Sequence, residues 1–283
     1  MSDSIHSEIQ SSSSIQIRPS RGLLDLELGA VWRYRELLYF LVLREIKVRY
    51  RQAVLGVAWA VIQPLFAVVV FTVIFGHFAK FPSDGVPYAV FAFAATLPWA
   101  YFAEATQRSA NGLVTDASLV SKVYFPRLIL PLAMVAAPLV DFLCAFVVFL
   151  GVLAWYGISP TLNLVFLPVL LFIAMMLALA IGLLLAPINV RFRDVRHTLP
   201  FIIQIWMYAS PIVYPLSMVP EQWRGLYSLN PMVGVIEGFR WVLLGTEHPD
   251  FVSMAISMVI IAAALFAGLV YFKKHERAFA DII

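Results

Sequence analysis

Charged residues are scarce in this chain of 283 residues, because Asp, Glu, Lys and Arg together make up 13% of it. Soluble domains carry roughly 25% of these residues. Hydrophobic residues make up 61% of the chain and occur in long uncharged runs. This balance excludes an ordinary soluble domain and predicts an all-α protein that crosses a membrane several times.

Cysteine is scarce too, since Cys144 is the only one and lies within a hydrophobic run. A single cysteine excludes an intrachain disulfide and a metal site built on cysteines. The five histidines are scattered, and neither H-E-x-x-H nor G-x-S-x-G occurs. We therefore predict no metal site, no catalytic residues and no enzymatic activity.

A phosphate-binding loop of the form G-x-x-x-x-G-K-[ST] is missing from the sequence. The chain is therefore expected not to hydrolyse ATP itself. Its net charge of +3 is dispersed between apolar segments rather than gathered in one patch. A nucleic-acid partner is for this reason not expected.

The first 22 residues are rich in serine and lack the apolar stretch that a cleavable signal needs. We interpret residues 1–22 as a disordered cytoplasmic tail. Residues 23–53 are predicted to contain an amphipathic helix. Aromatic and aliphatic residues share one of its faces, and Arg44, Lys47 and Arg51 share the other. Such a helix is expected to lie along the membrane surface, with its cations on anionic lipid.

Six runs with at most one charged residue each reach the length of about 20 residues that a helix needs to cross the hydrocarbon core. They are residues 54–78, 86–105, 128–155, 162–186, 198–216 and 252–272. We therefore predict a six-span domain over residues 54–272, followed by a C-terminal tail over residues 273–283.

Lys and Arg are distributed unevenly between the two sides that six spans would create. Placing both termini in the cytoplasm puts 17 of the 20 Lys and Arg residues on the cytoplasmic side. The other side keeps Lys80, Arg224 and Arg240. Because cytoplasmic loops carry the excess of positive charge, this orientation is predicted.

The stretch between the fifth and sixth runs has its own helix pattern. Asn230 and Pro231 are typical of a helix start, and Glu237 and Arg240 are spaced to pair on one face. The apolar part of this segment is too short to cross the membrane. It is predicted to enter from the outer side and return, with a flat surface helix as the alternative.

The loop after the second run also has a helix pattern, with Thr115 and Asp116 as cap candidates and Pro126 as the stop. It is more apolar than an idle loop needs, and it carries one cation, Lys122. The apolar residues are Leu119, Val120, Val123 and Tyr124. They predict docking to a partner or against the bundle.

Two carboxylates fall near or inside predicted spans. Glu104 is interpreted as an interfacial residue near Arg108. Asp141 lies well inside the third run, where an ionisable residue suggests a function. With no partner apparent at matching depth, we favour a hydrogen bond between helices over a proton relay.

Four separated blocks of sequence resemble the permease subunits of ABC-2 type polysaccharide exporters, the Wzm, KpsM and TagG group. They are REIKVRYRQAVLGVAWAVIQP from residue 44, SLVSKVYFPRLILP from 118, NVRFRDV with SPIVYP from 189, and LNPM with EGFRWVLLG from 229. The resemblance covers roughly residues 30–272 in order.

The resemblance implies a homodimer in the inner membrane that exports a lipid-linked polysaccharide, such as O-antigen, capsule or teichoic acid. Two separate ATPase subunits would bind ATP and Mg, and no cofactor is expected in this chain. By the same resemblance, residues 37–52 and 115–124 would meet the ATPase, and residues 231–244 would form an outer gate.

A glycan cannot dissolve in lipid, because each hydroxyl stripped of water costs several kcal/mol. It needs a lined path, for which aromatic side chains supply rigid faces. The candidates are Phe71, Trp99, Trp206, Tyr208 and Tyr214. Alternatives are an ABC-2 permease that exports a drug or lipid, or a membrane glycan polymerase or acyltransferase.

Overall fold

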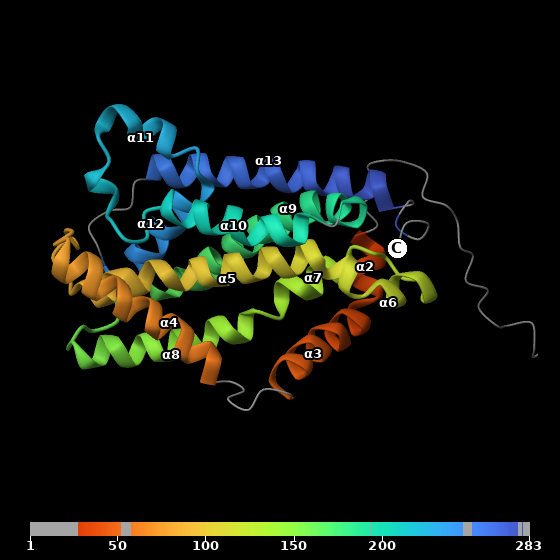
Figure 1. The fold of residues 1–283 in the computed structure, drawn as a ribbon, viewed down its shortest axis with the longest axis horizontal. Helices are drawn as coiled ribbons and strands as arrows, with labels where there is room; N and C mark the ends of the chain where they lie inside the picture. Colours follow the sequence, from red (N-terminus) through yellow and green to blue (C-terminus); the bar gives the residue numbers. More distant parts are fainter. Residues whose placement is uncertain (1–27, 52–57, 193, 246–250, 277–278, 280–283) are drawn as a thin grey trace, which may run out of the picture.

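A computed structural model of the chain describes residues 28–51, 58–192, 194–245, 251–276 and 279. In these ranges all regular structure is helical (Figure 1). The predicted tail over residues 1–22 lies outside the described residues, as do most of the residues after 276.

The helices follow one another along the chain with short connections. They are α2 Leu28–Arg33, α3 Arg35–Arg51, α4 Ala58–Phe71, the π-helix η2 Thr72–Phe78, α5 Tyr88–Thr115, α6 Ala117–Lys122, α7 Ile129–Ala136, α8 Leu139–Trp155, the 3-10 helix η3 Leu162–Phe166, α9 Leu167–Arg191, α10 Val195–Tyr208, the 3-10 helix η4 Leu216–Met218, α11 Glu221–Tyr227, α12 Pro231–Leu244 and α13 Phe251–His275.

Within the described ranges, four stretches are long and apolar enough to cross a membrane: Val61–Phe78, Ile129–Trp155, Leu162–Arg191 and Phe251–His275. They coincide with the first, third, fourth and sixth predicted runs. The chain is thus an all-α, multi-pass membrane protein. In the other two runs, α5 continues beyond the predicted residue 105 to Thr115, and α10 ends at Tyr208.

The prediction of a continuous fifth segment to residue 216 is wrong at its end. Residues 209–215 form turns rather than helix. Pro211 has no backbone N–H to continue the helix and disfavours helical geometry at Ser210. The chain therefore turns here and leads into α11 and α12.

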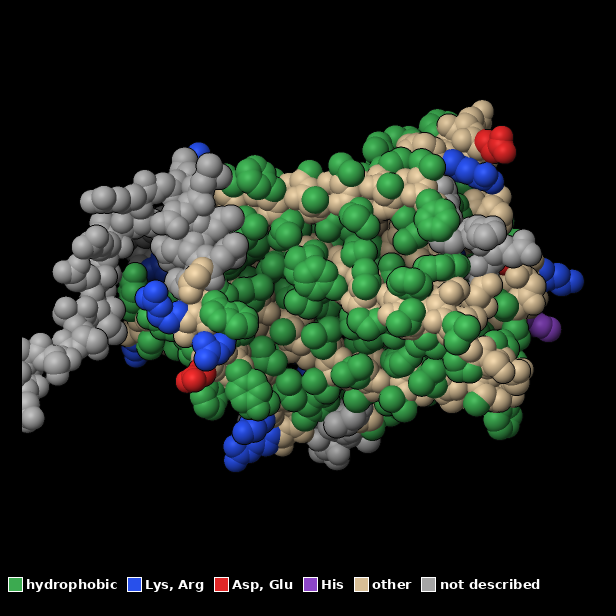
Figure 2. Space-filling model, turned by 180° about the vertical axis from the view of Figure 1, so that it is seen from behind, with side chains coloured by type: hydrophobic (Ala, Val, Ile, Leu, Met, Phe, Trp, Pro, Cys, Tyr) green, Lys and Arg blue, Asp and Glu red, His purple; other side chains and the backbone are tan. Residues whose placement is uncertain are grey.

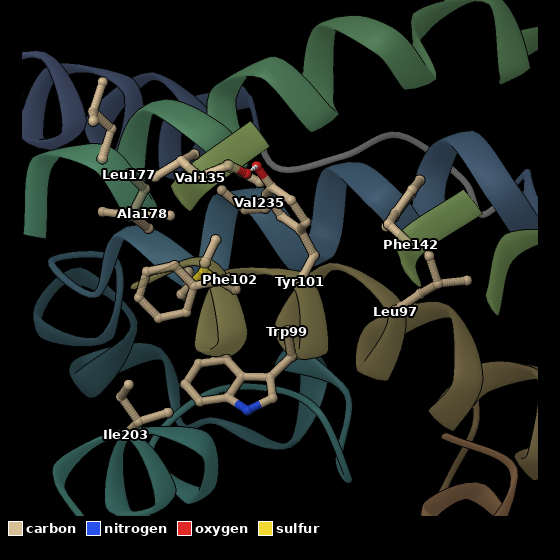
Figure 3. Packing of buried hydrophobic residues seen from close by; sticks show 14 of the residues in the cluster. Leu97, Trp99, Tyr101, Phe102, Val135, Phe142, Leu177, Ala178, Ile203 and Val235 are labelled. Carbon is tan, nitrogen blue, oxygen red and sulfur yellow. Dashed lines mark hydrogen bonds between the residues drawn. The ribbon is translucent and has the colours of Figure 1, made fainter. Parts of the chain in front are cut away.

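α5 is the central helix, and it packs against α4, α7, α8, α9 and α12. Most of its residues are buried. Figure 3 shows Trp99, Tyr101 and Phe102 of α5 among side chains of α7, α9, α10 and α12. A Cβ on Gly182 of α9 would lie 2.1 Å from Ser109 Oγ of α5. Glycine thus permits the close approach of these two helices.

The candidate span Ile129–Trp155 is broken between α7 and α8. Pro138 lies at the break and removes one hydrogen bond of the helix. The carbonyl of Val135, just before the break, accepts a hydrogen bond of 3.0 Å from the Tyr101 hydroxyl (Figure 3). A side chain of α5 thus satisfies a backbone group that lipid could not.

The two ends of the bundle differ in charge. We call the end that holds α6 and the last turn of α13 the α6 end, and the opposite end the α11 end (Figure 1). Figure 2 shows hydrophobic side chains over the middle of the molecule and a group of Lys and Arg side chains near the α6 end, on the left. An apolar band between polar ends is the surface that a bilayer requires.

Candidate functional site

α6 lies between α5 and α7 in the chain. Of the two predicted cap candidates, Asp116 occupies the N-cap position of α6 and Thr115 does not. Thr115 is the last residue of α5, and Asp116 makes no capping hydrogen bond within the described backbone. The reason is that the Asp116 carboxylate binds Arg44 of α3 instead.

The apolar residues predicted for docking divide between the bundle and the surface. Val120 is buried, and Leu119 is half-buried against the core. Val123 and Tyr124 are 49% and 69% exposed. Lys122 is exposed next to them. These last three residues form an apolar surface with one cation, which we call the α6 surface.

The segment that follows the α6 surface is held by the end of α13. The Arg127 side chain donates to the backbone carbonyl of Glu276, and its guanidinium lies 5.9 Å from the ring centroid of the buried Phe279. Lys273 pairs with Glu276 at 2.9 Å. The α6 surface is thereby connected to the last long helix as well as to α5 and α7.

α3 has a third side in addition to the two predicted for an amphipathic helix. Tyr39 is 62% exposed on the predicted apolar face, and Lys47 and Arg51 are exposed on the basic face. Glu45 and Arg49, which flank these faces, turn toward α5 and pair there. α3 is therefore bound to the bundle by charged groups as well as by the buried Leu41.

Arg44 of the basic face pairs with two carboxylates of the protein. Its guanidinium contacts Asp116 and lies 2.9 Å from Glu45. Partial burial lowers the pKa of Arg44, but the bonds to Glu45 and Asp116 outweigh burial and leave the pKa raised. Arg44 therefore stays cationic and ties α3 to the turn before α6.

A hollow of about 660 Å³ lies along α3. Its described lining combines cations with apolar residues: Phe40, Leu43, Arg44, Lys47, Val48 and Arg51. Cationic side chains next to apolar ones suit the membrane boundary, where anionic headgroups meet acyl chains.

Asp141 does have a basic partner, contrary to the prediction. It lies in the first turn of α8, where it contacts Arg49 at 2.6 Å and accepts a hydrogen bond from the Tyr50 hydroxyl. The interpretation as a hydrogen bond between helices is confirmed. Arg49 could not be predicted as the partner from the sequence, because it precedes Asp141 by 92 positions.

The predicted proximity of Glu104 and Arg108 is confirmed. Arg108 Nε lies 2.6 Å from Glu104 Oε1, one helical turn away on α5. Both residues also contact α3, through Arg49 and Glu45.

At the α11 end, the predicted start of α12 is confirmed. The Asn230 side chain accepts a hydrogen bond of 3.0 Å from the backbone N–H of Met232, and Pro231 occupies the first turn. Asn230 also donates to the Ala209 carbonyl at 3.0 Å and accepts from Trp206 Nε1 at 2.8 Å. It thus joins α12 to the end of α10.

The predicted pair of Glu237 and Arg240 is confirmed at 2.9 Å. Arg240 is only 2% exposed. Its guanidinium also donates to the Ile212 carbonyl at 3.0 Å and lies 3.7 Å from the ring centroid of Phe91. One cation therefore joins α12, the turn after α10 and α5.

Four of the five aromatic path candidates form two pairs, and one of the four, Trp99, is buried in the core rather than exposed to a path. Trp99 packs against Trp206 with ring centroids 6.4 Å apart, and the Tyr214 hydroxyl bonds the Tyr208 carbonyl at 3.2 Å. Both pairs lie around α10 and its C-terminal turn. Phe71 lies elsewhere, on α4, where it packs against Phe75.

A pocket of about 400 Å³, lined mainly by aromatic side chains, lies between α10, α11 and the start of α12. Trp206 and Asn230 line it together with Trp223 and Tyr227, which sequence reasoning missed. Burial raises the pKa of Tyr227, and a 2.9 Å hydrogen bond to Tyr214 raises it further, so this phenol stays neutral. Trp223 and Tyr227 lie four residues apart in the sequence shortly before Asn230, and this spacing could have predicted an aromatic surface here.

Metal chemistry finds no support in the described ranges, where no three His, Cys, Asp or Glu side chains are arranged to hold an ion. The described residues thus provide an exposed apolar surface with one cation at the α6 end, ion pairs between α3 and α5, and aromatic side chains at the α11 end.

Comparison with known proteins finds relatives over most of the chain. The family described as ABC-2 type transporter matches residues 36–244. The O-antigen export system permease protein RfbA of Myxococcus xanthus is 31% identical over 255 residues, which are 89% of this chain and 97% of that protein. RfbA of Klebsiella pneumoniae is 28% identical over 250 residues, 88% and 95% of the two chains. The polysialic acid transport protein KpsM of Escherichia coli is 26% identical over 250 residues, 84% and 93% of the two chains.

Proposed function

The chain belongs to the ABC-2 type transporter family, and on this premise we propose that it is the permease subunit of an exporter for a lipid-linked polysaccharide. The observation that carries the proposal is the near full-length similarity to O-antigen and polysialic acid exporters. The inner membrane is its location, because the relatives are transport permeases and the chain spans the membrane several times.

The orientation we propose places both termini and the α6 end in the cytoplasm. The grouping of Lys and Arg near this end supports the orientation (Figure 2). α5 and α10 would supply the second and fifth of six spans. α10 has 14 residues, which is short for a crossing, so α11 and α12 would complete the outer part of the barrier as a re-entrant gate.

The energy source we propose is a separate ATPase that binds ATP and Mg. The sequence has no phosphate-binding loop of its own, and the α6 surface offers apolar contact area where α5 meets the third span. Two such ATPases would serve a homodimer of this chain. Only 6% of the first span, Val61–Phe78, is buried, which leaves it free to face a second copy or lipid.

The substrate class we propose is a glycan chain on a lipid carrier. Trp206, Trp223 and Tyr227, which line the pocket between α10 and α11, offer flat faces to sugar rings. The hollow on α3 would hold a lipid headgroup.

Val123→Asp and Tyr124→Asp test the proposal in a strain that lacks its own copy of the chain. Wild type should restore the surface polysaccharide. Either variant should abolish export and weaken association with the ATPase roughly 30-fold, because losing a central contact costs about 2 kcal/mol. The measurements are surface glycan on gels and co-purification of the ATPase.

The matched control is Gln222→Asp, which adds the same charge at an exposed position of the α11 end and should leave the ATPase bound. Surface polysaccharide that is unchanged by loss of the chain would favour a drug or lipid exporter. Undiminished ATPase binding in both variants would exclude the α6 surface as the docking site.

A further inference from the structure

Seven charged side chains form one continuous series of ion pairs from the start of α6 to the start of α8. Asp116 binds Arg44; Arg44 lies 2.9 Å from Glu45; Glu45 lies 3.4 Å from Arg108; Arg108 lies 2.6 Å from Glu104; Glu104 lies 2.9 Å from Arg49; and Arg49 lies 2.6 Å from Asp141. Acidic and basic residues alternate at every step. We call this series the charge ladder.

The ladder has a regular geometry because its two helices carry complementary patterns. On α3, Glu45 and Arg49 are spaced by four residues, and on α5, Glu104 and Arg108 have the same spacing. Both spacings correspond to a rise of about 6 Å, so the two pairs can face each other at matching height. Glu45 meets Arg108, and Arg49 meets Glu104. α3 and α5 are therefore joined by rungs rather than by a single contact.

The ladder is partly sheltered from water. Glu45, Asp116 and Asp141 have side chains only 15–18% exposed, and Arg108 is 25% exposed. Charges in such positions are screened less than surface pairs. Removing one member takes one charged partner from each of its neighbours in a half-buried site, so α3 and α5 are expected to move together.

The far end of the ladder coincides with the break in the third span. Asp141 lies in the first turn of α8, three residues after Pro138. A carboxylate in this position is also stabilised by the partial positive charge at the helix N-terminus. A helix broken at proline can bend there, and the Tyr101 hydroxyl of α5 donates a hydrogen bond to the Val135 carbonyl beside the break. The ladder thus connects the turn before α6 with a point where the third span can change its angle.

We propose that the charge ladder transmits displacement of α6 to the break between α7 and α8, and so couples the ATPase to the transport path. Glu45, Arg49, Glu104, Arg108 and Asp141 are positioning residues in this link. The inference rests on the proposed docking of the ATPase at the α6 surface. It goes further by stating which side chains carry the movement into the membrane.

Asp141→Asn tests the link because it removes the last charge and leaves the α6 surface untouched. The complex of permease and ATPase is reconstituted in vesicles, and glycan transported is measured per ATP hydrolysed. Insertion, ATPase association and ATP hydrolysis should persist. Glycan per ATP should fall about tenfold, within the range of measured couplings between sites. Asp141→Glu, which keeps the charge, should restore most of the transport.

Glu104→Gln removes a charge in the middle of the ladder. Glu104 is its most exposed member, with 38% of the side chain exposed. This variant should lower glycan transported per ATP in the same way, even if Asp141→Asn fails to fold. Asp194→Asn removes an exposed carboxylate of the α9–α10 turn and should transport like wild type.

A wild-type ratio of glycan to ATP in both ladder variants would overturn the link. So would loss of ATPase association in either, since the ladder would then only hold the docking surface in place. Failure of the proposed function is distinguishable, because wild type itself would then transport no glycan.

Discussion

Arg240 illustrates at the scale of one residue how a charge is kept in the interior of this protein. Burying a cation is costly unless it is paired and hydrogen-bonded. Here Glu237, the Ile212 carbonyl and the face of Phe91 surround the guanidinium together. The planar group can meet all three partners at once, which an ammonium group cannot do equally well.

Exchanging the charges of Glu237 and Arg240 should therefore not preserve the stability of the protein. Arg240→Lys is expected to lower the stability of the purified protein, and Arg240→Gln should cost about 3–5 kcal/mol, as for a broken buried pair. The reversed pair, Glu237→Arg with Arg240→Glu, should not recover, because a carboxylate at position 240 would face a carbonyl oxygen and a ring face. Thermal unfolding in detergent measures this, and recovery in the double variant would contradict it.

Residue contacts were predictable from the sequence only where the partners are close along the chain. Glu237 with Arg240, Glu104 with Arg108, and the cap by Asn230 all depend on spacings within one helical turn. Arg49 with Asp141 and Arg44 with Asp116 depend on how α3 crosses the bundle. Nothing in the local pattern of charges specifies that crossing.

At the scale of helices, small residues decide how closely α5 and α9 pack. A Cβ on Gly182 would meet Ser109 Oγ at 2.1 Å, whereas among the described residues no atom lies within 4 Å of a Cβ on Gly151 of α8. In a membrane, close backbone approach replaces the hydrophobic effect as the source of helix association.

Gly182→Ala and Gly151→Ala form a matched pair for this reason. Gly151→Ala should leave stability unchanged or raise it by up to about 1 kcal/mol, since alanine favours the helix. Gly182→Ala should lower it by about 1–3 kcal/mol, because α5 and α9 must separate or strain. Thermal unfolding of both purified variants in the same detergent measures the difference. Equal unfolding temperatures would show that α5 and α9 adjust freely.

Helix identity was predicted better than helix ends. Four long apolar stretches coincide with predicted runs. α5 outlasts its predicted end because only the apolar run was predicted, whereas Glu104 and Arg108 favour the helix and pair with each other one turn apart. Pro138 cannot donate a helical hydrogen bond, which is a local property of the sequence, but the hydrogen bond from Tyr101 to the Val135 carbonyl depends on tertiary packing.

At the scale of the whole molecule, the uneven distribution of Lys and Arg predicts which end faces the cytoplasm. Cys144 is the only native cysteine, so Cys144→Ser gives a background without thiols. Ser121→Cys lies at the α6 end and Gln222→Cys at the α11 end, and both positions are exposed.

In intact spheroplasts, an impermeant maleimide should label Gln222→Cys and not Ser121→Cys. Opening the membrane should expose Ser121→Cys. The parent with Cys144→Ser alone serves as the blank and should remain unlabelled. Labelling of Ser121→Cys from outside would reverse the orientation and with it the position proposed for the ATPase.

The contact of Arg127 with Glu276 and Phe279 also has a consequence for biosynthesis. Glu276 lies 149 residues after Arg127. At ribosome speeds of 5–20 residues per second, Arg127 waits roughly 7–30 s for these partners. During that interval the segment beside the α6 surface has yet to be tied to the last helix. A nascent chain stopped before residue 276 would present this untied segment to quality-control proteases, whereas the finished chain conceals it.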